Sequence, residues 1–456
     1  MDETIKLAEF ISNISYSDLS EDVIDKAKGL LLDQLGCQLA FAVKPWCEGV
    51  YNYAKAKAGN DKSSTVVHFG LRTLAEDAAF ANAVFGHGFE MDDTHLNTAT
   101  HPGVAVIPAA LAIGEMKKSN GKDFITAIVA GYDMFLRIST ASWAMMFRGF
   151  HTTGVVGLFG AAAATAKLLD FNKNMIVDAM GIAASNAGGI SEYTETGGSV
   201  KRLHAGFAAQ GGIRAALLAQ YGLTGPKTSL EGKKGFCQSY ADEFSIPALT
   251  ADLGGPFRII ETGNKPYCCC AAQHSTIDAV SILKAQYNIK PEEVDSVTVH
   301  QGTREARAVG TIIEPTDITS AQFSGRFGIA LRLIKGSNGF TDYNEENIKN
   351  PDILALAKKV SYYNDDEFDK LTVKTAPSRV TIRLKNGNIY KKQVDAAKGT
   401  LQNPMTKDEL AEKFRNLALT VMSDKQVENI IQIINDLEKI DDINILGSIL
   451  VADRYR

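Results

Sequence analysis

The feature that most constrains the fold of this chain is the series of helical patterns that fills its first 260 or so residues. After Ser20, a favourable N-cap residue, apolar side chains recur at helical spacing from Val23 to Leu35. Further helices are predicted at 74–87, 103–117, 123–142, 155–169, 173–185 and 204–223, and Pro108 should kink or restart the second of these. Several carry runs of small residues such as Ala161–Ala164, which let helices approach closely. This half of the chain is therefore expected to form a compact multi-helix domain.

The pattern changes after about Lys265. A helix predicted at 275–286 precedes a β-branched alternation at 294–300, and a second alternation at 379–384 runs through Asn386-Gly387 into 389–390. Asn-Gly between two such runs predicts a hairpin with a type I′ turn. Helices are expected again at 407–421 and 425–439. The predicted fold is mainly α with an α+β part: a large helical domain from 1–265 and 396–456, and a smaller α+β domain, 266–395, inserted before the C-terminal helices.

Composition excludes several classes of protein. The 456 residues include 48 Lys and Arg against 53 Asp and Glu, so the net charge is −5, and no basic stripe suggests a nucleic-acid partner. Apolar runs such as 104–113 and 158–166 are about half the length of a membrane span, so no membrane partner is expected. The start of the chain shows no secretory signal, and six cysteines are too few for a disulfide scaffold. We therefore expect a cytoplasmic protein.

The placement of the eight histidines is the most informative local feature. Several stand in polar, glycine-containing loops just before apolar helices. The densest segment runs from His87 to His95 and contains Glu90, Asp92 and Asp93; His101 follows, just before Pro102. His101 is expected at the positive end of the next helix, beside free backbone N–H groups where anions bind well. Imidazoles and carboxylates together could donate and accept protons near neutral pH, although a helix cap with solvated acids is the plainer alternative.

Three later segments share this design. Residues 148–154 contain His151, residues 197–206 place glycines beside Lys201 and Arg202, and residues 265–274 begin with Lys265 and end with His274 at the predicted domain junction. Glycines next to cations suit the capture of a carboxylate or phosphate. The alternatives are a structural histidine, a surface loop with solvated cations, and a plain interdomain connector. The triplet Cys268-Cys269-Cys270 is interpreted as small buried residues rather than a nucleophile.

Other kinds of site are not favoured. Asp92, Asp93, His95 and His101 are metal-ligand types, but no zinc-protease or His-Asp metal motif occurs, so no metal is predicted. The phosphate-binding loops of nucleotide enzymes and the Gly-x-Ser-x-Gly elbow of serine hydrolases are also missing.

Taken together, these segments resemble the MmgE/PrpD family over nearly the whole chain. The resemblance is carried, in order, by residues 86–95 with 101–103, 149–151, 200–209, 222–226, 230–232 with 235–236, 265–274, 322–324 and 403–406. It implies a large helical domain with a smaller α+β lid domain, usually in a homodimer. Members include 2-methylcitrate dehydratase, cis-aconitate decarboxylase and iminodisuccinate epimerase, which implies a small polycarboxylate substrate and no metal or organic cofactor.

The resemblance also implies site residues. Asp93 corresponds to the family's acidic motif, Thr94 to its hydroxyl residue and His101 to its first histidine. The second histidine corresponds to His151, and the carboxylate-binding lysine to Lys201. The pair at the domain junction corresponds to Lys265 and His274. Three residues depart from the family pattern: Glu90 stands where the decarboxylases tend to have Asp, Cys268 replaces a frequent Pro, and Phe327 stands where a lid Tyr is common.

The resulting hypothesis is a cofactor-independent lyase acting on a di- or tricarboxylate, with 2-methylcitrate-type dehydration as the first choice. Lys201 and Lys265 would bind carboxylates, His101 and His151 would act as acid and base, and Asp93 would orient or activate a histidine. Decarboxylation of a cis-aconitate-type acid and epimerisation of a dicarboxylate are the enzymatic alternatives. A helical binding or scaffold protein is the non-enzymatic one.

Overall fold

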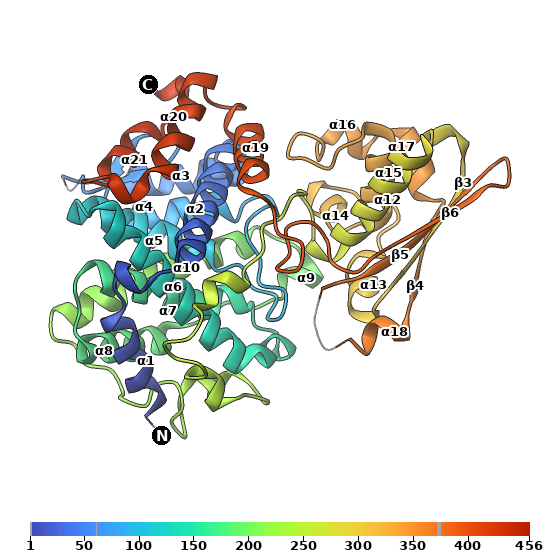
Figure 1. Ribbon diagram of the computed structural model, residues 1–456. Helices are drawn as coiled ribbons and strands as arrows, with labels where there is room; N and C mark the ends of the chain where they lie inside the picture. The colour runs from blue at the N-terminus through green and yellow to red at the C-terminus, as the bar shows by residue number, and fades with distance from the viewer. Residues whose placement is uncertain (1, 61, 372–374) are drawn as a thin grey trace. The chain divides into compact units, whose positions relative to one another are not determined.

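The computed structural model describes residues 2–60, 62–371 and 375–456, which form two compact units (Figure 1). Unit 1 comprises Met1–Gly88, Asp92–Thr262 and Lys407–Arg456, and unit 2 comprises Phe89–Met91 and Gly263–Thr406. Unit 1 is helical apart from one two-stranded ribbon, whereas unit 2 combines helices with a four-stranded sheet. The predicted fold class, mainly α with an α+β part, is confirmed.

Unit 1 contains fourteen of the α-helices that the structure describes. They are α1 (Glu3–Asn13), α2 (Glu21–Phe41), α3 (Pro45–Lys57), α4 (Ala75–Gly86), α5 (Gly103–Lys117), α6 (Gly121–Ser142), α7 (Thr152–Leu168), α8 (Lys173–Asn186), α9 (Tyr193–Thr196), α10 (Val200–Gln220), α11 (Phe236–Tyr240), α19 (Lys407–Ala418), α20 (Asp424–Asn435) and α21 (Asn444–Ile449); the ribbon pairs β1 (Ser64–Val66) with β2 (Leu71–Thr73). Helix α5 has both predicted ends and continues through Pro108, so the expected restart does not occur. Ser20 is the N-cap of α2, as predicted.

Helix α10 packs against α4, α7 and α8, and small residues make this close packing possible. A Cβ atom on Gly206 would lie 2.7 Å from side-chain atoms of Phe80 and Val84 on α4. A Cβ atom on Gly212 would lie 2.5 Å from the Cβ of Ala161 on α7. The glycines and alanines of the sequence are therefore the contact surface of these helices, as helix packing at short axial distances requires.

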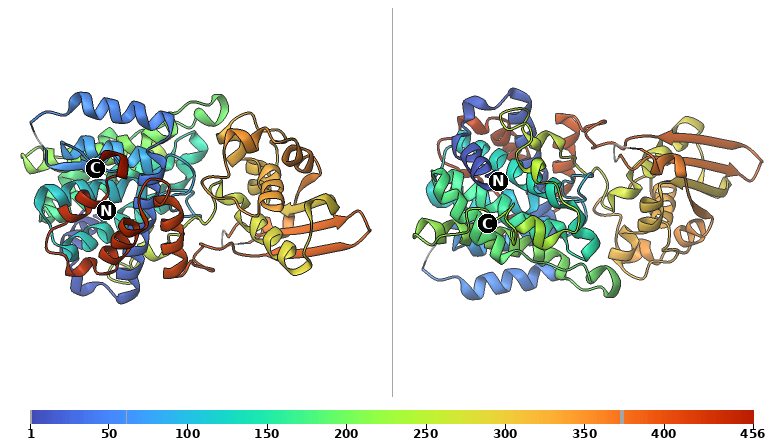
Figure 2. Two further views of the ribbon diagram at one scale, coloured as in Figure 1. Left: turned by 90° about the horizontal axis from the view of Figure 1, so that it is seen from above. Right: turned by 90° about the horizontal axis from the view of Figure 1, so that it is seen from below.

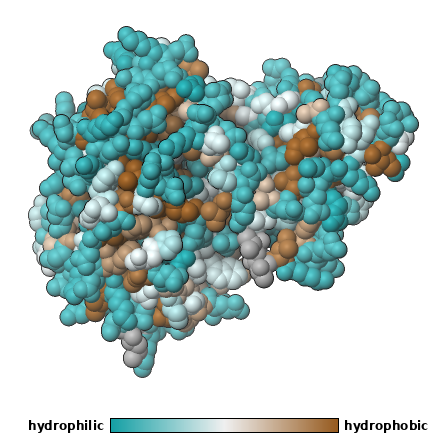
Figure 3. Space-filling view, in the orientation of Figure 1, coloured by the Kyte–Doolittle hydropathy of each residue, from teal (hydrophilic) through white to brown (hydrophobic). Residues whose placement is uncertain are grey.

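One helix of unit 1 meets the length criterion that the sequence analysis applied to membrane spans. Gly121–Arg148, which joins α6 to a short 3-10 helix, is long and apolar enough to cross a membrane by length and composition. A buried core helix meets the same criterion, so this finding is weak evidence of a membrane span. Of its most apolar window, 94% is buried within the protein, and its Asp133 and Arg137 pair with each other in the interior. On the face shown in Figure 3, apolar residues are interspersed with polar ones.

Unit 2 is built on a sheet with the order β4-β3-β5-β6. Its strands are β3 (Val294–Gln301), β4 (Val360–Asn364), β5 (Ser378–Leu384) and β6 (Ile389–Val394); its helices are α12 (His274–Tyr287), α13 (Thr303–Val309), α14 (Ile318–Gln322), α15 (Gly325–Lys335), α16 (Glu345–Ile348), α17 (Pro351–Ala357) and α18 (Asp366–Asp369). β3 runs parallel to β4 and antiparallel to β5. Helix α12 packs on β5 and β6, and α15 packs against α12, so these helices lie on one face of the sheet (Figure 2).

The hairpin predicted at Asn386-Gly387 is present, but its turn differs from the predicted type. β5 and β6 pair antiparallel, and of the two central residues only Gly387 has a positive φ, 89°. The N–H of Gly387 donates to the carbonyl of Leu384, whose own N–H donates to Asn388. This is the pattern of a three-residue loop in which glycine takes the left-handed position, so a type I′ turn, which needs positive φ at both residues, is not formed.

Candidate active site

Four histidines of unit 1 come together where four packed helices begin or end. His87 directly follows α4, His101 lies two residues before α5, His151 is the N-cap of α7, and His204 is in the second turn of α10. The ring centroid of His87 lies 5.2 Å from that of His101 and 5.7 Å from that of His151, and the centroids of His151 and His204 are 5.2 Å apart. We call these four residues the histidine cluster.

Asp92 is the carboxylate closest to the cluster. The His87 Nδ1–H donates to Asp92 Oδ2 at 2.8 Å, and both side chains are fully buried. The same oxygen lies 3.4 Å from His101 Nδ1. Because Nδ1 of His87 is the donor, the lone pair of the neutral ring is on Nε2, and this buried atom has no hydrogen-bond partner among the described residues. His87 therefore presents a buried acceptor beside His101 and His151.

His101 is held in one tautomer by the backbone. Its Nδ1–H donates to the main-chain carbonyl of Asp93 at 2.6 Å, and its backbone N–H donates to Thr153 Oγ1 at 3.2 Å. Since a carbonyl can only accept, the proton of the neutral ring is on Nδ1 and the lone pair is on Nε2. The side chain is 14% exposed, more than those of His87 or Asp92. His101 thus has the geometry of a proton acceptor that a ligand could reach.

The carboxylate of Asp93 points to the start of α5 rather than to a histidine. The Gly103 N–H donates to both of its oxygens, at 3.1 and 3.0 Å, and the Tyr132 hydroxyl donates to Oδ2 at 2.7 Å. The first backbone donor of α5 is therefore occupied by the protein's own acid, where a free anion-binding end was expected. Burial raises the pKa of Asp93 to about 7, and the nearby Asp92 charge adds to this although Tyr132 opposes it. The next residue, Thr94, is also buried.

We predict that Gly103→Ala destabilises the protein because only glycine fits between α5 and the Asp93 side chain. A Cβ atom at this position would lie 2.5 Å from the Tyr132 hydroxyl and 2.9 Å from Asp93 Oδ2. Such overpacking should lower the free energy of unfolding by about 1–3 kcal/mol, measured by denaturant titration. The matched control is Gly49→Ala in α3, where an added Cβ meets nothing within 4 Å and should stabilise by up to about 1 kcal/mol. Equal stability of the two variants would contradict the prediction.

His151 and His204 form a direct imidazole pair, with their Nδ1 atoms 3.0 Å apart. Burial, strengthened by the nearby His87 and Lys201 charges, holds the pKa of His151 well below its usual value. Lys201 is half-buried in the first turn of α10. Its neighbour Arg202 makes different contacts, because its Nε–H donates to the Gly88 carbonyl at 3.0 Å and its guanidinium lies 4.1 Å from the ring centre of Trp46.

Lys265 and His274 belong to unit 2. Lys265 is only 2% exposed, and its Nζ lies 3.4 Å from Glu90 Oε2. Glu90 adopts a positive φ of 58°, a strained conformation for a residue that is not glycine, and such strain is common at functional sites. His274 is the first residue of α12, and its Nε2–H donates to the Cys269 carbonyl at 3.2 Å, which puts the lone pair of the neutral ring on Nδ1.

The cysteine triplet and Phe327 have structural surroundings in unit 2. The Cys268 thiol and the Gln322 amide both donate to the Phe89 carbonyl, each at 2.9 Å, and so hold the segment that carries Glu90. Burial raises the pKa of Cys269, which disfavours the reactive thiolate. Phe327 is fully buried in α15.

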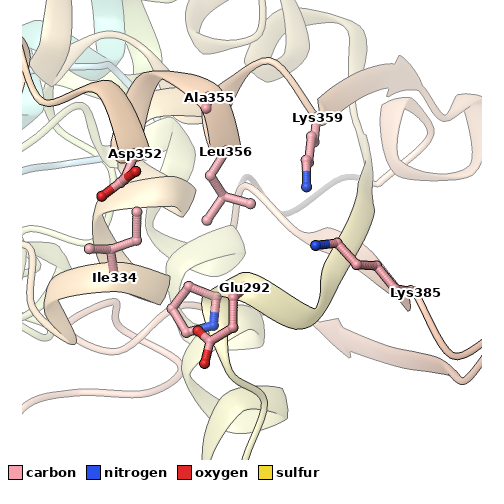
Figure 4. A pocket seen from close by; sticks show the side chains of 8 residues that line it. Glu292, Ile334, Asp352, Ala355, Leu356, Lys359 and Lys385 are labelled. Carbon is pink, nitrogen blue, oxygen red and sulfur yellow. The ribbon is translucent and has the colours of Figure 1, made fainter.

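Unit 2 also has a hollow of about 440 Å³ that contains none of the predicted site residues (Figure 4). Its acidic lining residues are Glu292 and Asp352, and its basic ones are Lys359 and Lys385. The ammonium group of Lys359 donates to the Val294 carbonyl at 2.7 Å, so part of the basic lining is already bonded within the unit.

No sequence pattern gave a role to His87, Asp92, Tyr132 or His204. His87 and Asp92 were visible in the densest histidine segment, and His204 closed the segment that contains Lys201. Tyr132 lies in the middle of α6 and gave no local signal, because its partner Asp93 is 39 residues away in the chain. Within the described ranges, no three His, Cys, Asp or Glu side chains are placed to share a metal ion.

Comparison with known proteins agrees with this organisation. The family model of the MmgE/PrpD N-terminal domain matches residues 5–248, and that of the MmgE/PrpD C-terminal domain matches residues 267–439. Among curated proteins, the chain is 28% identical to a cis-aconitate decarboxylase of Aspergillus terreus, over 98% of this chain and 95% of the relative. It is 27% identical to the cis-aconitate decarboxylase of Homo sapiens, over 98% of this chain and 94% of the relative.

A third relative, the cis-aconitate decarboxylase-like protein oryM of Aspergillus oryzae, is 27% identical over 99% of this chain and 97% of its own. These alignments span both units, and they cover nearly the full length of this chain and of each relative. With both family models matched in order along almost its whole length, the chain belongs to the MmgE/PrpD family.

Proposed function

We propose that this protein is a lyase that acts on a small polycarboxylate with its own side chains as acid–base groups, and that decarboxylation of a cis-aconitate-type acid is its reaction. The observation that carries the proposal is the histidine cluster, in which His101 has a tautomer set by the backbone and the positive charge of Lys201 acts on His151. The full-length similarity to cis-aconitate decarboxylases favours this reaction over the 2-methylcitrate-type dehydration that the sequence analysis placed first.

The proposed chemistry requires few groups. The bond between the departing carboxylate and its neighbouring carbon breaks, and its electron pair spreads into the conjugated double bond and remaining carboxylates. A proton then adds to carbon, so carbon dioxide and an unsaturated dicarboxylate are formed. Cations stabilise the negative charge that develops, and one general acid supplies the proton.

Each predicted residue except Thr94 has a proposed part in this scheme. Lys201 binds a substrate carboxylate, and His151 delivers the proton to carbon. His101, whose Nε2 can take up a proton and release it, is the alternative proton donor. Asp93 positions His101 through its main-chain carbonyl, and Thr94 follows it in the same buried segment. In unit 2, Lys265 is a second candidate for carboxylate binding, and His274 a second candidate for proton transfer.

The test is proton NMR of the purified, chelator-treated full-length protein in heavy water. Cis-aconitate, citrate, 2-methylcitrate and simple dicarboxylates are supplied separately. We expect loss of carbon dioxide from cis-aconitate with one deuterium in the product. Loss of water from 2-methylcitrate would replace decarboxylation with dehydration, and deuterium exchange without net change would indicate epimerisation. No reaction, together with no rise in melting temperature with any acid, would support a binding or scaffold role instead.

Lys201→Ala should lose turnover, whereas Lys173→Ala, an exposed lysine on α8, should not.

We also predict that polycarboxylate binding takes up a proton. Without a ligand, His151 is neutral near pH 7, because its burial holds its pKa well below the usual value. A bound anion favours the charged imidazolium and raises that pKa, so affinity should fall as pH rises. Calorimetry with tricarballylate, a saturated analogue, in two buffers of different ionisation enthalpy measures the uptake. His151→Gln should abolish it, and an unchanged uptake in that variant would assign the proton to another group.

A further inference from the structure

His204 has no part in the scheme above, yet its side chain is in direct contact with that of His151. The two Nδ1 atoms lie 3.0 Å apart, so one of them must donate and the other accept. Burial lowers the pKa of His204 to about 4 and also lowers that of His151, so both rings are neutral near pH 7. Two neutral rings in this arrangement share a single proton on the Nδ1–Nδ1 line. One ring is then protonated at Nδ1 and the other at Nε2.

The position of the His204 ring is fixed by glycines. A Cβ atom on Gly154 would lie 2.8 Å from the His204 Cβ, and one on Gly189 would lie 3.3 Å from its ring. Gly189 also has a φ of 128°, a conformation that other residues rarely adopt. The ring therefore fits into a space that side chains at these two positions would fill, and its Nδ1 is directed at His151.

His204 also lines an open hollow of about 600 Å³ in unit 1. The other polar residues in its lining are Asn186, Gln210 and Arg214, and its large apolar residues are Leu158, Ile190 and Phe207. Phe207 is 51% exposed. His151 is buried, and it is not among the residues that line this hollow. His204 is thus in contact with His151 on one side and with an open space on the other.

Decarboxylation consumes protons, and this arrangement could supply them to His151. Each turnover replaces a carboxylate by a hydrogen, so one proton must come from water for every carbon dioxide released. A buried general acid that has delivered its proton can act again only after it has been reprotonated. His151 has this difficulty if it is the general acid of the proposed function.

We propose that His204 is a positioning residue that supplies His151 with protons from the hollow, an inference that rests on the proposed function. A proton from water adds to His204 Nε2, the Nδ1 proton of His204 passes to His151 Nδ1, and the Nε2 proton of His151 passes to the substrate carbon. Each ring gains one proton and loses one. The starting tautomers return when the product leaves and the rings exchange protons with water.

The test combines three variants with cis-aconitate turnover. His204→Ala removes the relay and leaves space in which imidazole can bind, His204→Asn keeps a hydrogen-bonding group without a relay, and Phe207→Ala is the control from the same hollow. We expect turnover to fall about 10²-fold in both His204 variants, the low end of the usual cost of losing a proton-transfer group, and to stay unchanged in Phe207→Ala. Added imidazole should restore His204→Ala in a saturable way and should not restore His204→Asn.

Two results would overturn the relay. The first is a His204→Ala variant that turns over substrate as fast as the wild type. The second is an equal loss of turnover in both His204 variants without rescue by imidazole, because a merely structural role of His204 predicts that result. A second readout needs no substrate: nitrogen NMR of histidine-labelled wild-type protein should show His151 and His204 neutral and in opposite tautomers. Two rings both protonated at Nε2 would exclude the shared proton. If the wild-type protein transforms none of the acids, the proposed function is wrong and the relay that rests on it is wrong too. The nitrogen NMR spectrum would then still show whether His151 and His204 share a proton.

Discussion

Replacing His101 with alanine should lower turnover of the substrate by about 10²–10⁴-fold, the usual cost of removing a general acid or base. The expectation rests on two features of the ring. Its tautomer is set by the 2.6 Å bond from Nδ1–H to the Asp93 carbonyl, so Nε2 carries the lone pair. Its side chain is also more exposed than those of its buried neighbours His87 and Asp92. Single-turnover and steady-state rates with cis-aconitate measure the effect.

The control for this experiment is His95→Gln. His95 lies in the same segment, but its Nδ1 forms a hydrogen bond with Thr98 Oγ1 at 2.7 Å and its Nε2 lies 3.3 Å from Glu261 Oε2, so both ring nitrogens face neighbouring side chains of unit 1. This variant should lose stability while a folded sample keeps most of its turnover. Melting curves of both variants separate loss of fold from loss of chemistry. Near-full turnover in His101→Ala would remove His101 from the mechanism.

The parts of the fold that could be predicted were those with a strong local pattern. Long, periodic helices such as α5 and α8 were found to within a residue or so because their apolar spacing and caps are contained in the segment itself. The strand β4 was missed because its partner β3 ends 59 residues earlier, with several short helices between them. Parallel pairing across such a connection leaves no mark within either strand.

The candidate site shows a similar limit. The histidine loops were recognised because imidazoles before apolar helices are unusual, and the fold does bring His101 and His151 into one cluster. The roles of Asp92 and Asp93 could not be separated in the same way. These neighbours point in different directions, one toward His87 and the other toward Tyr132 and the start of α5. Only the packing of α6 against that segment distinguishes the two carboxylates.

Asp93 should make the stability of the protein fall as pH rises from about 4 to about 8. Burial raises the pKa of its carboxyl from 3.8 to about 7 in the folded state, so over this range the folded protein holds a proton that the unfolded chain has already lost. The free energy of unfolding therefore decreases as pH rises. The total decrease is about 4 kcal/mol, because the pKa of Asp93 rises from 3.8 to about 7 on folding and each pKa unit corresponds to ~1.4 kcal/mol. The contribution is complete below the unfolded pKa and is lost as pH passes through 7.

Denaturant titrations of wild type and Asp93→Asn between pH 4 and 8 isolate this effect, since the amide is a neutral isostere with no proton to lose. The decline in stability should be smaller in Asp93→Asn by about 4 kcal/mol. Tyr132→Phe is the matched variant: its hydroxyl donates to Asp93 Oδ2 and opposes the rise in pKa, so its removal should raise the pKa further and move the decline to higher pH. If the profiles of wild type and Asp93→Asn were parallel, another buried acid would cause the decline. If they diverge as expected, the Asp93 carboxyl is neutral below about pH 7.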